Sequence, residues 1–296
     1  MNNYLSELTI VIVTYKTNFD ILKNCLQSID PKVKTLIIEN SNELNCHQEI
    51  KNQFSNVEVI CTGTNMGYGV GNNFGLSKVK TKYALILNPD IVCDKEYFKN
   101  IKIYLDKTVD FTIIGSQYYE ILNYKSAFFF NNKEFDYNMK EDANNLQMVD
   151  WVVGCSILFD LEKFESKKIF DEKYFLFYEE KDLCLRLKKK GHQVYSSKIL
   201  KVDHLGGKSS LEEDLSNIKL IKIRNWHLMW STFYYDKKNH NFIYAILKSI
   251  GPLIRWSIKS IFCLVFFRKK EFIKYFYRSF GLICSIIGMS SWYRVD

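Results

Sequence analysis

The sequence Thr-Ile-Val-Ile-Val-Thr-Tyr, residues 9–15, is a run of β-branched and apolar side chains near the start of a 296-residue chain. Such a run, apolar on both faces, is typical of a strand buried inside a parallel sheet. A helical pattern follows it, with Asn18 as the capping residue, apolar side chains on one face as far as Ile29, and Pro31 at its end. This order of strand and helix indicates the start of a β-α-β unit.

Three more strands are predicted downstream, at 34–39, 57–62 and 83–87. Helical patterns lie between them, near 44–54 and 70–79. The alternation predicts an α/β fold whose central sheet is mainly parallel. Ligands of such sheets bind beyond the carboxyl ends of the strands. We therefore expect the binding site where polar residues follow the strands, at 39–41, 62–73 and 88–90.

The second half of the chain is less regular. Residues 120–150 are polar and predict a loop-rich insertion, after which regular structure resumes with the apolar run 149–159. A short amphipathic helix is predicted over 182–190 and ends at Gly191, because glycine is a common residue just past a helix end. Two strands are predicted after this helix, near 193–196 and 199–203.

The positive charge of the chain is concentrated at its C-terminal end. The net charge is +8, but residues 237–296 hold 11 Lys and Arg side chains against two acids, so the rest is close to neutral. A nucleic-acid binder more often carries its basic charge on the folded body, so the pattern argues against that class. Eight scattered cysteines without a Cys-x-x-Cys pair, and a polar N-terminus without a signal-peptide pattern, predict an intracellular protein.

Residues 241–296 are dense in apolar side chains that cations interrupt. The longest uncharged runs, 260–267 and 279–293, are shorter than the roughly 20 residues of a membrane-spanning helix. Basic amphipathic helices are typical of an interface with anionic lipid. We therefore expect a cytoplasmic protein that is peripheral on the inner face of the cell membrane. The alternative is that these helices cover the protein's own core or form a dimer; a homo-oligomer stays open.

The first candidate site is the glycine-rich loop after the third strand, Asn-Met-Gly-Tyr-Gly-Val-Gly-Asn-Asn-Phe-Gly at 65–75. Glycine lets backbone amides approach a ligand, and the start of a helix favours an anion. The run lacks the third glycine of the dinucleotide-binding fingerprint and does not follow the first strand. An ordinary glycine-rich turn explains the glycines equally well.

Carboxylates and a histidine form the other candidates. Asp90 in Leu-Asn-Pro-Asp-Ile stands at a strand end, where a single acid suits either a divalent cation or an ordinary turn. Glu179, Glu180 and Asp182 open a helix after an aromatic segment. They either cap that helix or include a base whose pKa is raised by an apolar pocket. His204 ends a strand and is either structural or a metal ligand.

In their order and spacing, these segments resemble glycosyltransferase family 2, which has the GT-A fold, and in particular its rhamnosyltransferase-like branch. The resemblance covers about 9–210. It rests on the opening strand, the Glu-Asn-Ser turn at 39–41, the glycine-rich loop, Leu-Asn-Pro-Asp-Ile at 87–91, Trp-Val-Val-Gly-Cys-Ser at 151–156, the segment 170–186 and His-Leu-Gly-Gly-Lys-Ser at 204–209.

The resemblance implies an inverting, metal-dependent transfer of a sugar, such as rhamnose, from a dTDP- or UDP-sugar to a glycan or lipid-linked glycan. It implies that Asp90 and His204 hold Mg²⁺ or Mn²⁺, and that Glu180 is the catalytic base, with Asp182 as a rival. It also implies a set of residues that bind the nucleotide-sugar: Thr14, Tyr15, Glu39, Asn65, Gly67, Gly69, Asn73 and Asn88. Glu39, Asn88 and Glu180 stand where the family more usually has Asp.

The predicted organisation is a GT-A domain over 1–240 and a basic amphipathic helical region over 241–296. Within the domain, the nucleotide-sugar half covers about 1–120 and the acceptor half about 145–210. A non-catalytic GT-A-like subunit that binds a nucleotide or glycan is the alternative, because three acidic positions are exchanged. A nucleotidyltransferase fits less well, since residues 16–20 contain no glycine.

Overall fold

The computed structural model describes residues 4–106, 109–120, 145–204 and 216–294. The chain divides into two compact units. Unit 1 comprises Met1–Phe170 and Leu183–Leu211, and unit 2 comprises Asp171–Asp182 and Glu212–Asp296. Most of the insertion expected over 120–150 lies outside the described residues.

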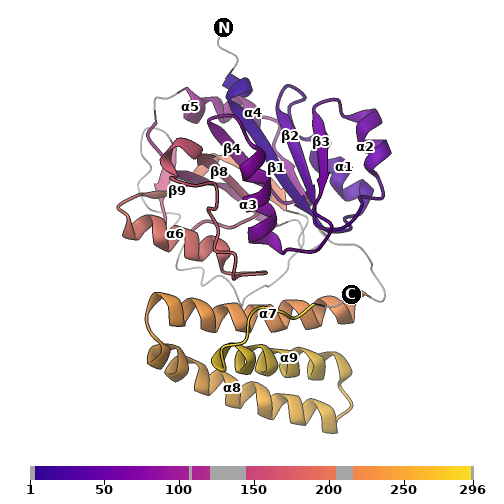
Figure 1. Cartoon of the computed structure of the whole chain (residues 1–296), viewed down its shortest axis with the longest axis vertical. Helices are drawn as coiled ribbons and strands as arrows, with labels where there is room; N and C mark the ends of the chain where they lie inside the picture. Colours follow the sequence, from indigo (N-terminus) through magenta and orange to yellow (C-terminus); the bar gives the residue numbers. More distant parts are fainter. Residues whose placement is uncertain (1–3, 107–108, 121–144, 205–215, 295–296) are drawn as a thin grey trace. The chain divides into compact units, whose positions relative to one another are not determined.

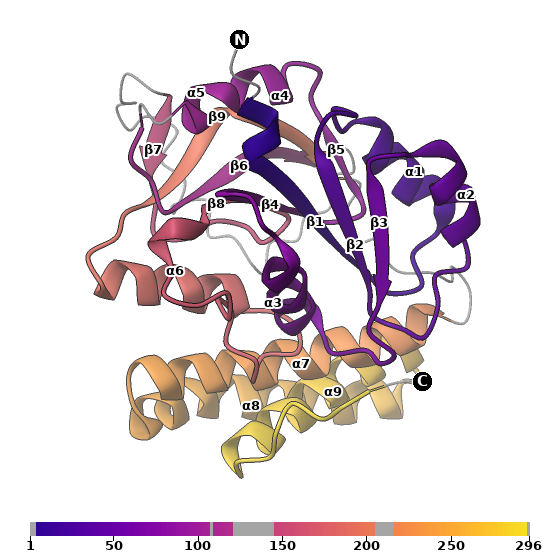
Figure 2. The ribbon, with the colours of Figure 1, turned by 45° about the horizontal axis from the view of Figure 1, so that its top comes forward.

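Unit 1 is built on one sheet, which has nine strands in the described part of the chain. The strands are β1 Leu8–Thr14, β2 Lys34–Glu39, β3 Val57–Cys61, β4 Tyr83–Leu87, β5 Ile91–Cys93, β6 Ile113–Glu120, β7 Leu146–Met148, β8 Ser156–Asp160 and β9 Val194–His204. Their order is β3-β2-β1-β4-β8-β6-β9-β5, and β7 pairs with β9. Strands β1 to β4 are parallel neighbours, so their carboxyl ends meet at one edge of the sheet (Figure 2).

Helices cover both faces of this sheet, because alternate side chains of a strand point to opposite faces. They are the 3₁₀ turn η1 Tyr4–Glu7, α1 Phe19–Gln27, α2 His47–Gln53, α3 Tyr68–Lys78, α4 Tyr97–Asn100, α5 Lys102–Leu105 and the greater part of α6 Glu179–Lys189. On one face, Ile10 and Ile12 of β1 belong to the same apolar cluster as side chains of α1 and α2. On the other face, Val11 and Val13 belong to a cluster with Leu76 of α3.

The predicted α/β fold with a mainly parallel sheet is confirmed, and β2 and β4 have the predicted bounds. The prediction of two strands near 193–196 and 199–203 is wrong, since β9 is one strand that shifts its register against β6. Polar residues in its middle interrupt the apolar pattern. One of them, Ser197, is buried there because its hydroxyl group pairs with the hydroxyl group of Tyr104 over 2.9 Å.

Unit 2 contains three long helices, α7 Ser216–Asn239, α8 Phe242–Val265 and α9 Lys269–Ile286, which lie side by side (Figure 1). At Gly281, α9 comes so close to α7 that an added Cβ would stand 2.1 Å from the carbonyl oxygen of Trp226. Trp226 and Phe233 of α7 are fully buried. Unit 2 includes α7, which supplies part of the core on which α8 and α9 pack, whereas the domain boundary expected at 240 stays a prediction.

The last two helices are amphipathic, as the sequence predicts. Ala245, Trp256 and Cys263 of α8 are buried, whereas the opposite side of the helix exposes a series of aliphatic side chains. Among the described residues, no helix combines the length and the apolar character that crossing a membrane requires.

Candidate active site

The carboxyl ends of β1 and β2 are joined through a buried carboxylate. Thr14 and Glu39 are partners in the register of the two strands. The Thr14 hydroxyl group donates a hydrogen bond to Glu39 Oε2 over 2.6 Å. The Lys16 amide and the Ser41 hydroxyl group donate to Glu39 Oε1 over 3.1 and 2.6 Å. Glu39 is fully buried. Its carboxylate therefore fixes the loops that follow β1 and β2, the first of which carries the partly buried Tyr15.

The loop before α3 has a fixed shape. Asn65 Oδ1 accepts a hydrogen bond from the Gly67 amide over 3.1 Å, and Asn40 Nδ2 donates to the Gly67 carbonyl oxygen over 3.0 Å. Gly67 has a φ of 86°, a conformation that favours glycine. Since α3 begins at the next residue, this loop presents the helix N-terminus at the edge of the sheet where the strands end.

Later glycines of the run serve packing inside α3. A Cβ at Gly71 would stand 2.9 Å from Val13 Cγ1, and one at Gly75 would stand 2.4 Å from Val11 Cγ1. Gly69 is buried in the first turn of the helix. These later glycines allow α3 to lie close to β1 and β2. That the start of the run brings amides to a ligand stays a prediction.

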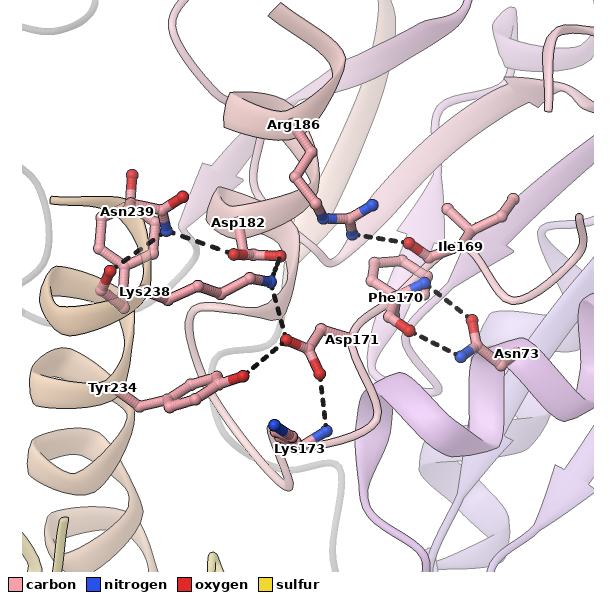
Figure 3. A network of polar contacts seen from close by, with 11 residues as sticks. Asn73, Ile169, Phe170, Asp171, Lys173, Asp182, Arg186, Tyr234, Lys238 and Asn239 are labelled. Carbon is pink, nitrogen blue, oxygen red and sulfur yellow. Dashed lines mark hydrogen bonds and ion pairs between the residues drawn. The ribbon is translucent and has the colours of Figure 1, made fainter. Parts of the chain in front are cut away.

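Asn73 links α3 to the backbone just before unit 2. Its Nδ2 donates to the Phe170 carbonyl oxygen and its Oδ1 accepts from the Phe170 amide, both over 2.9 Å (Figure 3). Arg186 of α6 donates to the neighbouring Ile169 carbonyl oxygen over 2.7 Å. The side chain of Asn73 is thus used inside the protein, and it fixes the position of residue 170.

The turn after β4 presents Asn88 and Asp90. The Asn88 amide donates to the Cys155 carbonyl oxygen over 2.8 Å, and the Ile91 amide donates to the Asn88 carbonyl oxygen over 3.2 Å. Asp90 is 1% exposed. In the antiparallel pairing of β5 with β9, Ile91 is the partner of His204. The backbone therefore brings the residue after Asp90 beside the candidate histidine.

These residues fit a hard divalent cation. Oxygen ligands are those that Mg²⁺ and Mn²⁺ prefer, and Asp90 offers a carboxylate. Asn88 Oδ1 is buried and has no hydrogen-bond partner among the residues that the structure describes. Within the same residues, no cluster of three or more His, Cys, Asp or Glu side chains is present. Water or diphosphate oxygens would have to complete such a site.

Unit 2 carries the acidic start of α6. Phe177 and Tyr178, directly before it, have positive φ angles of 70° and 72°. Bulky residues in this conformation cost about 1–3 kcal/mol each and gather at functional sites. The Ser231 hydroxyl group holds the segment by donating to the Leu176 carbonyl oxygen over 2.9 Å, and the ring of Tyr235 lies 5.3 Å from that of Tyr178. Unit 2 thus compensates for a strained approach to the acids.

Burial raises the pKa of both Glu179 and Glu180. The Glu180 carboxylate beside it raises the pKa of Glu179 further. Backbone amides partly offset the rise for both acids, and the Lys181 ammonium group also lowers the pKa of Glu180. The Oε2 atom of each is buried without a hydrogen-bond partner in the described ranges. Of the two acids, Glu179 has the pKa that is raised further.

Asp182 has a different environment. It is fully buried, its Oδ2 pairs with Lys238 Nζ over 2.8 Å, and its Oδ1 accepts from Asn239 Nδ2 over 3.3 Å (Figure 3). The same Lys238 ammonium pairs with Asp171 over 2.7 Å, and the Tyr234 hydroxyl group donates to Asp171 over 3.0 Å. Burial raises the pKa of Asp171, but Lys238 and these hydrogen bonds outweigh it and hold that pKa below its ordinary value. Asp182 is thus engaged in binding α7.

Sequence reasoning missed two contributors to this region. Lys238 is 56 residues from Asp182, and nothing in the sequence distinguishes it from the other cations. The Tyr68 hydroxyl group donates to the Gly154 carbonyl oxygen. A tyrosine between glycines and a glycine in an apolar run were weak signals of that contact.

The chain has relatives among characterised proteins. The sequence profile of glycosyl transferase family 2 matches residues 9–161. The low-salt glycan biosynthesis hexosyltransferase Agl10 of Haloferax volcanii is 25% identical over 214 residues, 68% of this chain and 67% of that protein. The rhamnosyltransferase WbbL of Escherichia coli is 25% identical over 252 residues, which cover 76% of this chain and 91% of that protein. The dTDP-rhamnosyl transferase RfbF of Shigella flexneri is 23% identical over 248 residues, which cover 79% of this chain and 81% of that protein.

A solved structure of similar fold is that of the mannosyltransferase PcManGT from Pyrobaculum calidifontis in complex with GDP-Man and Mn²⁺. Its TM-score is 0.55 at 9% identity, and the match covers 95% of this chain and 87% of that one. At this identity the likeness shows the fold, and the predicted GT-A fold is confirmed. The rhamnosyltransferase-like resemblance and the prediction of a glycosyltransferase are also confirmed. The chain belongs to glycosyl transferase family 2.

Proposed function

We propose that this glycosyltransferase moves a rhamnosyl or hexosyl group, with inversion, from a dTDP- or UDP-sugar to a growing lipid-linked or surface glycan. The names of the relatives support this choice, since two are rhamnosyltransferases and one of these is named for a dTDP-linked sugar. The observation that carries the proposal is the environment of Glu180, a half-buried residue with a raised pKa whose Oε2 atom is buried and has no hydrogen-bond partner in the described part of the chain.

Glu180 is the base in this proposal. Its raised pKa suits the acceptance of a proton near neutral pH better than that of an ordinary surface carboxylate. Asp182 is the weaker candidate, because Lys238 and Asn239 engage its two oxygens. Glu179 is the more buried of the two acids, and burial together with the Glu180 carboxylate raises its pKa further.

The donor is held at the carboxyl ends of β1 to β4. Tyr15 and the loop that contains Asn65 and Gly67 line this edge, and Thr14 and Glu39 position them. Gly69 belongs to the helix start that faces an anion such as diphosphate. Asn73 acts through its bonds to Phe170, as a positioning residue.

Asp90 holds Mg²⁺ or Mn²⁺ in this proposal. The amide oxygen of Asn88, which is nearby in sequence, and His204 are the further ligands. When bound there, the cation supplies charge neutralisation to the leaving nucleoside diphosphate. The buried Asp90 carboxylate and the Asn88 amide oxygen, which has no hydrogen-bond partner among the described residues, support this assignment.

The transfer is a single displacement. The acceptor hydroxyl oxygen forms a bond to the anomeric carbon while its proton passes to a Glu180 carboxylate oxygen. The bond between the anomeric carbon and the diphosphate oxygen breaks, and its electron pair leaves with the nucleoside diphosphate. Attack from the side opposite the leaving group inverts the anomeric configuration.

We also place the protein in the cytoplasm, peripheral on the inner face of the cell membrane, where lipid-linked acceptors are accessible. The surplus of cations over acids in residues 237–296 supports attraction to anionic lipid. No described helix crosses a membrane, so the contact would be one with the membrane surface.

A panel of nucleotide-sugars tests this function. The chain is incubated with each donor and Mg²⁺ or Mn²⁺, and donor affinity, hydrolysis and thermal protection are measured with and without a chelator. We expect one dTDP- or UDP-sugar to bind and hydrolyse only with the metal. Asp90→Asn should lose the metal-dependent part of this binding, whereas Asp94→Asn, at an exposed acid in the same segment, should keep it. Binding without hydrolysis of any donor would favour the non-catalytic subunit instead.

A further inference from the structure

The outer side of α8 carries an apolar stripe that no other described element covers. Its members recur at steps of three and four residues along the whole helix and are 47–70% exposed: Ile243, Leu247, Ile250, Ile254, Ile258, Ile261 and Val265. This spacing places them on one side of a helix. The stripe is continued by Phe266 and Phe267, of which the second is 93% exposed. An apolar surface of this extent on a single helix marks an interaction site.

The charges beside the stripe all have one sign. Arg255 and Lys259 are exposed on one flank of α8, between the apolar stripe and the buried side. The exposed run 268–270, Arg-Lys-Lys, follows the phenylalanine pair at the turn into α9. Helix α8 contains no acidic residue, and Glu271 is the sole acid between 237 and 295.

We propose that α8 docks lengthwise on an anionic lipid bilayer, with the stripe inserted at the headgroup boundary and the cations among the lipid phosphates. This inference rests on the proposed peripheral location and names the surface that provides it. A helix of 24 residues is roughly 36 Å long, so it would lie in the interface plane. Amphipathic helices with aliphatic and aromatic side chains on one side and cations beside them bind in this way.

The charge pattern favours lipid over a second copy of the chain. The residue spacing of the stripe also suits a coiled-coil dimer. However, the positions beside a coiled-coil interface usually carry charges of both signs, which pair across the interface. Two copies joined through this stripe would bring Arg255 and Lys259 near the same residues of the partner, with no acid on α8 to pair with them. Like charges facing each other weaken an interface. An anionic bilayer would bury the apolar stripe and pair with the cations.

Vesicle co-sedimentation of the full chain tests the proposal, with phosphatidylcholine vesicles and with vesicles that also contain phosphatidylglycerol. The stripe variant is Ile254→Gln/Ile258→Gln/Ile261→Gln, and the basic variant is Arg268→Gln/Lys269→Gln/Lys270→Gln. The matched control, Ile103→Gln/Met148→Gln, changes exposed apolar side chains of unit 1. All substituted side chains are exposed, so we expect unfolding temperatures close to that of the wild type. Should the stripe variant misfold, Ile243→Gln/Leu247→Gln replaces it.

We expect the wild type and the control to bind anionic vesicles. The stripe variant should bind on the order of 100-fold or more weakly, because the inserted apolar area is lost. The basic variant should also bind on the order of 100-fold more weakly, since each cation beside an anionic leaflet contributes roughly a factor of five. Salt should weaken wild-type binding more than that of the basic variant.

Three outcomes overturn the proposal: a wild type that does not bind anionic vesicles, a stripe variant that binds as the wild type does, or a wild-type dimer that the stripe changes dissociate while no form binds vesicles. Vesicle binding needs no nucleotide-sugar, and donor hydrolysis needs no vesicle. Failure of this inference is therefore distinguishable from failure of the proposed enzymatic function.

Discussion

Lys238 joins the two ends of the segment 171–182. Its ammonium group lies 2.7 Å from Asp171 and 2.8 Å from Asp182, and its side chain is 27% exposed. Two partly or fully buried carboxylates share one cation, so removing the cation takes the ion-pair partner away from both. Removal of one partner from a buried ion pair costs far more than the pair itself contributes.

Lys238→Met should therefore lower the free energy of unfolding by about 3 kcal/mol, at the low end of the range for buried pairs because Lys238 is partly exposed. Lys237→Met is the matched control, since Lys237 is exposed and lies on the same turn of α7. Chemical denaturation of both variants measures the effect. Equal stabilities of the two variants would show that Lys238 does not hold the segment.

At the scale of elements, α3 depends on glycine for its place on the sheet. The added Cβ of Gly75→Ala would meet Val11 and Ile38 at 2.4 and 2.9 Å. Overpacking of this kind typically costs about 1–3 kcal/mol. We expect a loss of that size in denaturation experiments. Gly251→Ala, where a Cβ meets nothing within 4 Å, should change the stability by less than about 1 kcal/mol. A Gly75→Ala protein as stable as the wild type would contradict the close packing of α3.

The start of α6 makes stability depend on pH. The folded chain raises the pKa of Glu179 well above its ordinary value of 4.5, so the folded state keeps a proton that the unfolded state has already lost. The stability contributed by this group is therefore present at low pH, falls as the pH rises above 4.5 towards the folded pKa, and is lost beyond it.

Glu179→Gln removes the loss of stability at high pH, because glutamine does not ionise. We expect its unfolding temperature to exceed that of the wild type at about pH 8 and to match it more closely at about pH 5. Glu172→Gln, an exposed acid of the same segment, is the control and should show no such difference. If Glu179→Gln is equally or less stable than the wild type at the higher pH, the carboxyl group is not desolvated as the structure indicates.

For the whole molecule, local patterns predicted the first half of unit 1 well. The run 9–15, the capping Asn18 and the bounds of β2 and β4 follow from side-chain periodicity and capping within a few residues. The polar turn that contains Asp90 was placed at a strand end for the same reason. These features are local, and the physical forces that fix them act between residues close in sequence.

Sequence patterns could not show contacts between residues that are distant in sequence. The buried Ser197 of β9 pairs with the hydroxyl group of Tyr104, which is 93 residues away. Because the sequence does not show this partner, the polar residue was interpreted as the end of one strand and the start of another. Asn73 bonds to the Phe170 backbone, 97 residues away, which a sequence pattern cannot show. The composition changes near residue 240 and so gave no sign that α7, which ends there, packs with α8 and α9.

The central claim is that Glu180 accepts the proton of the acceptor hydroxyl group. The most direct test is single-turnover transfer by Glu180→Gln, with donor affinity measured in parallel and Asp182→Asn as the comparison. An amide is isosteric but cannot accept that proton, so we predict unchanged donor affinity and a loss on the order of 10²–10⁴-fold in the rate of transfer. Asp182→Asn should chiefly reduce stability, because it weakens the bond to Lys238. Near-normal transfer by Glu180→Gln, together with a loss of that size in a folded Asp182→Asn protein, would contradict the assignment.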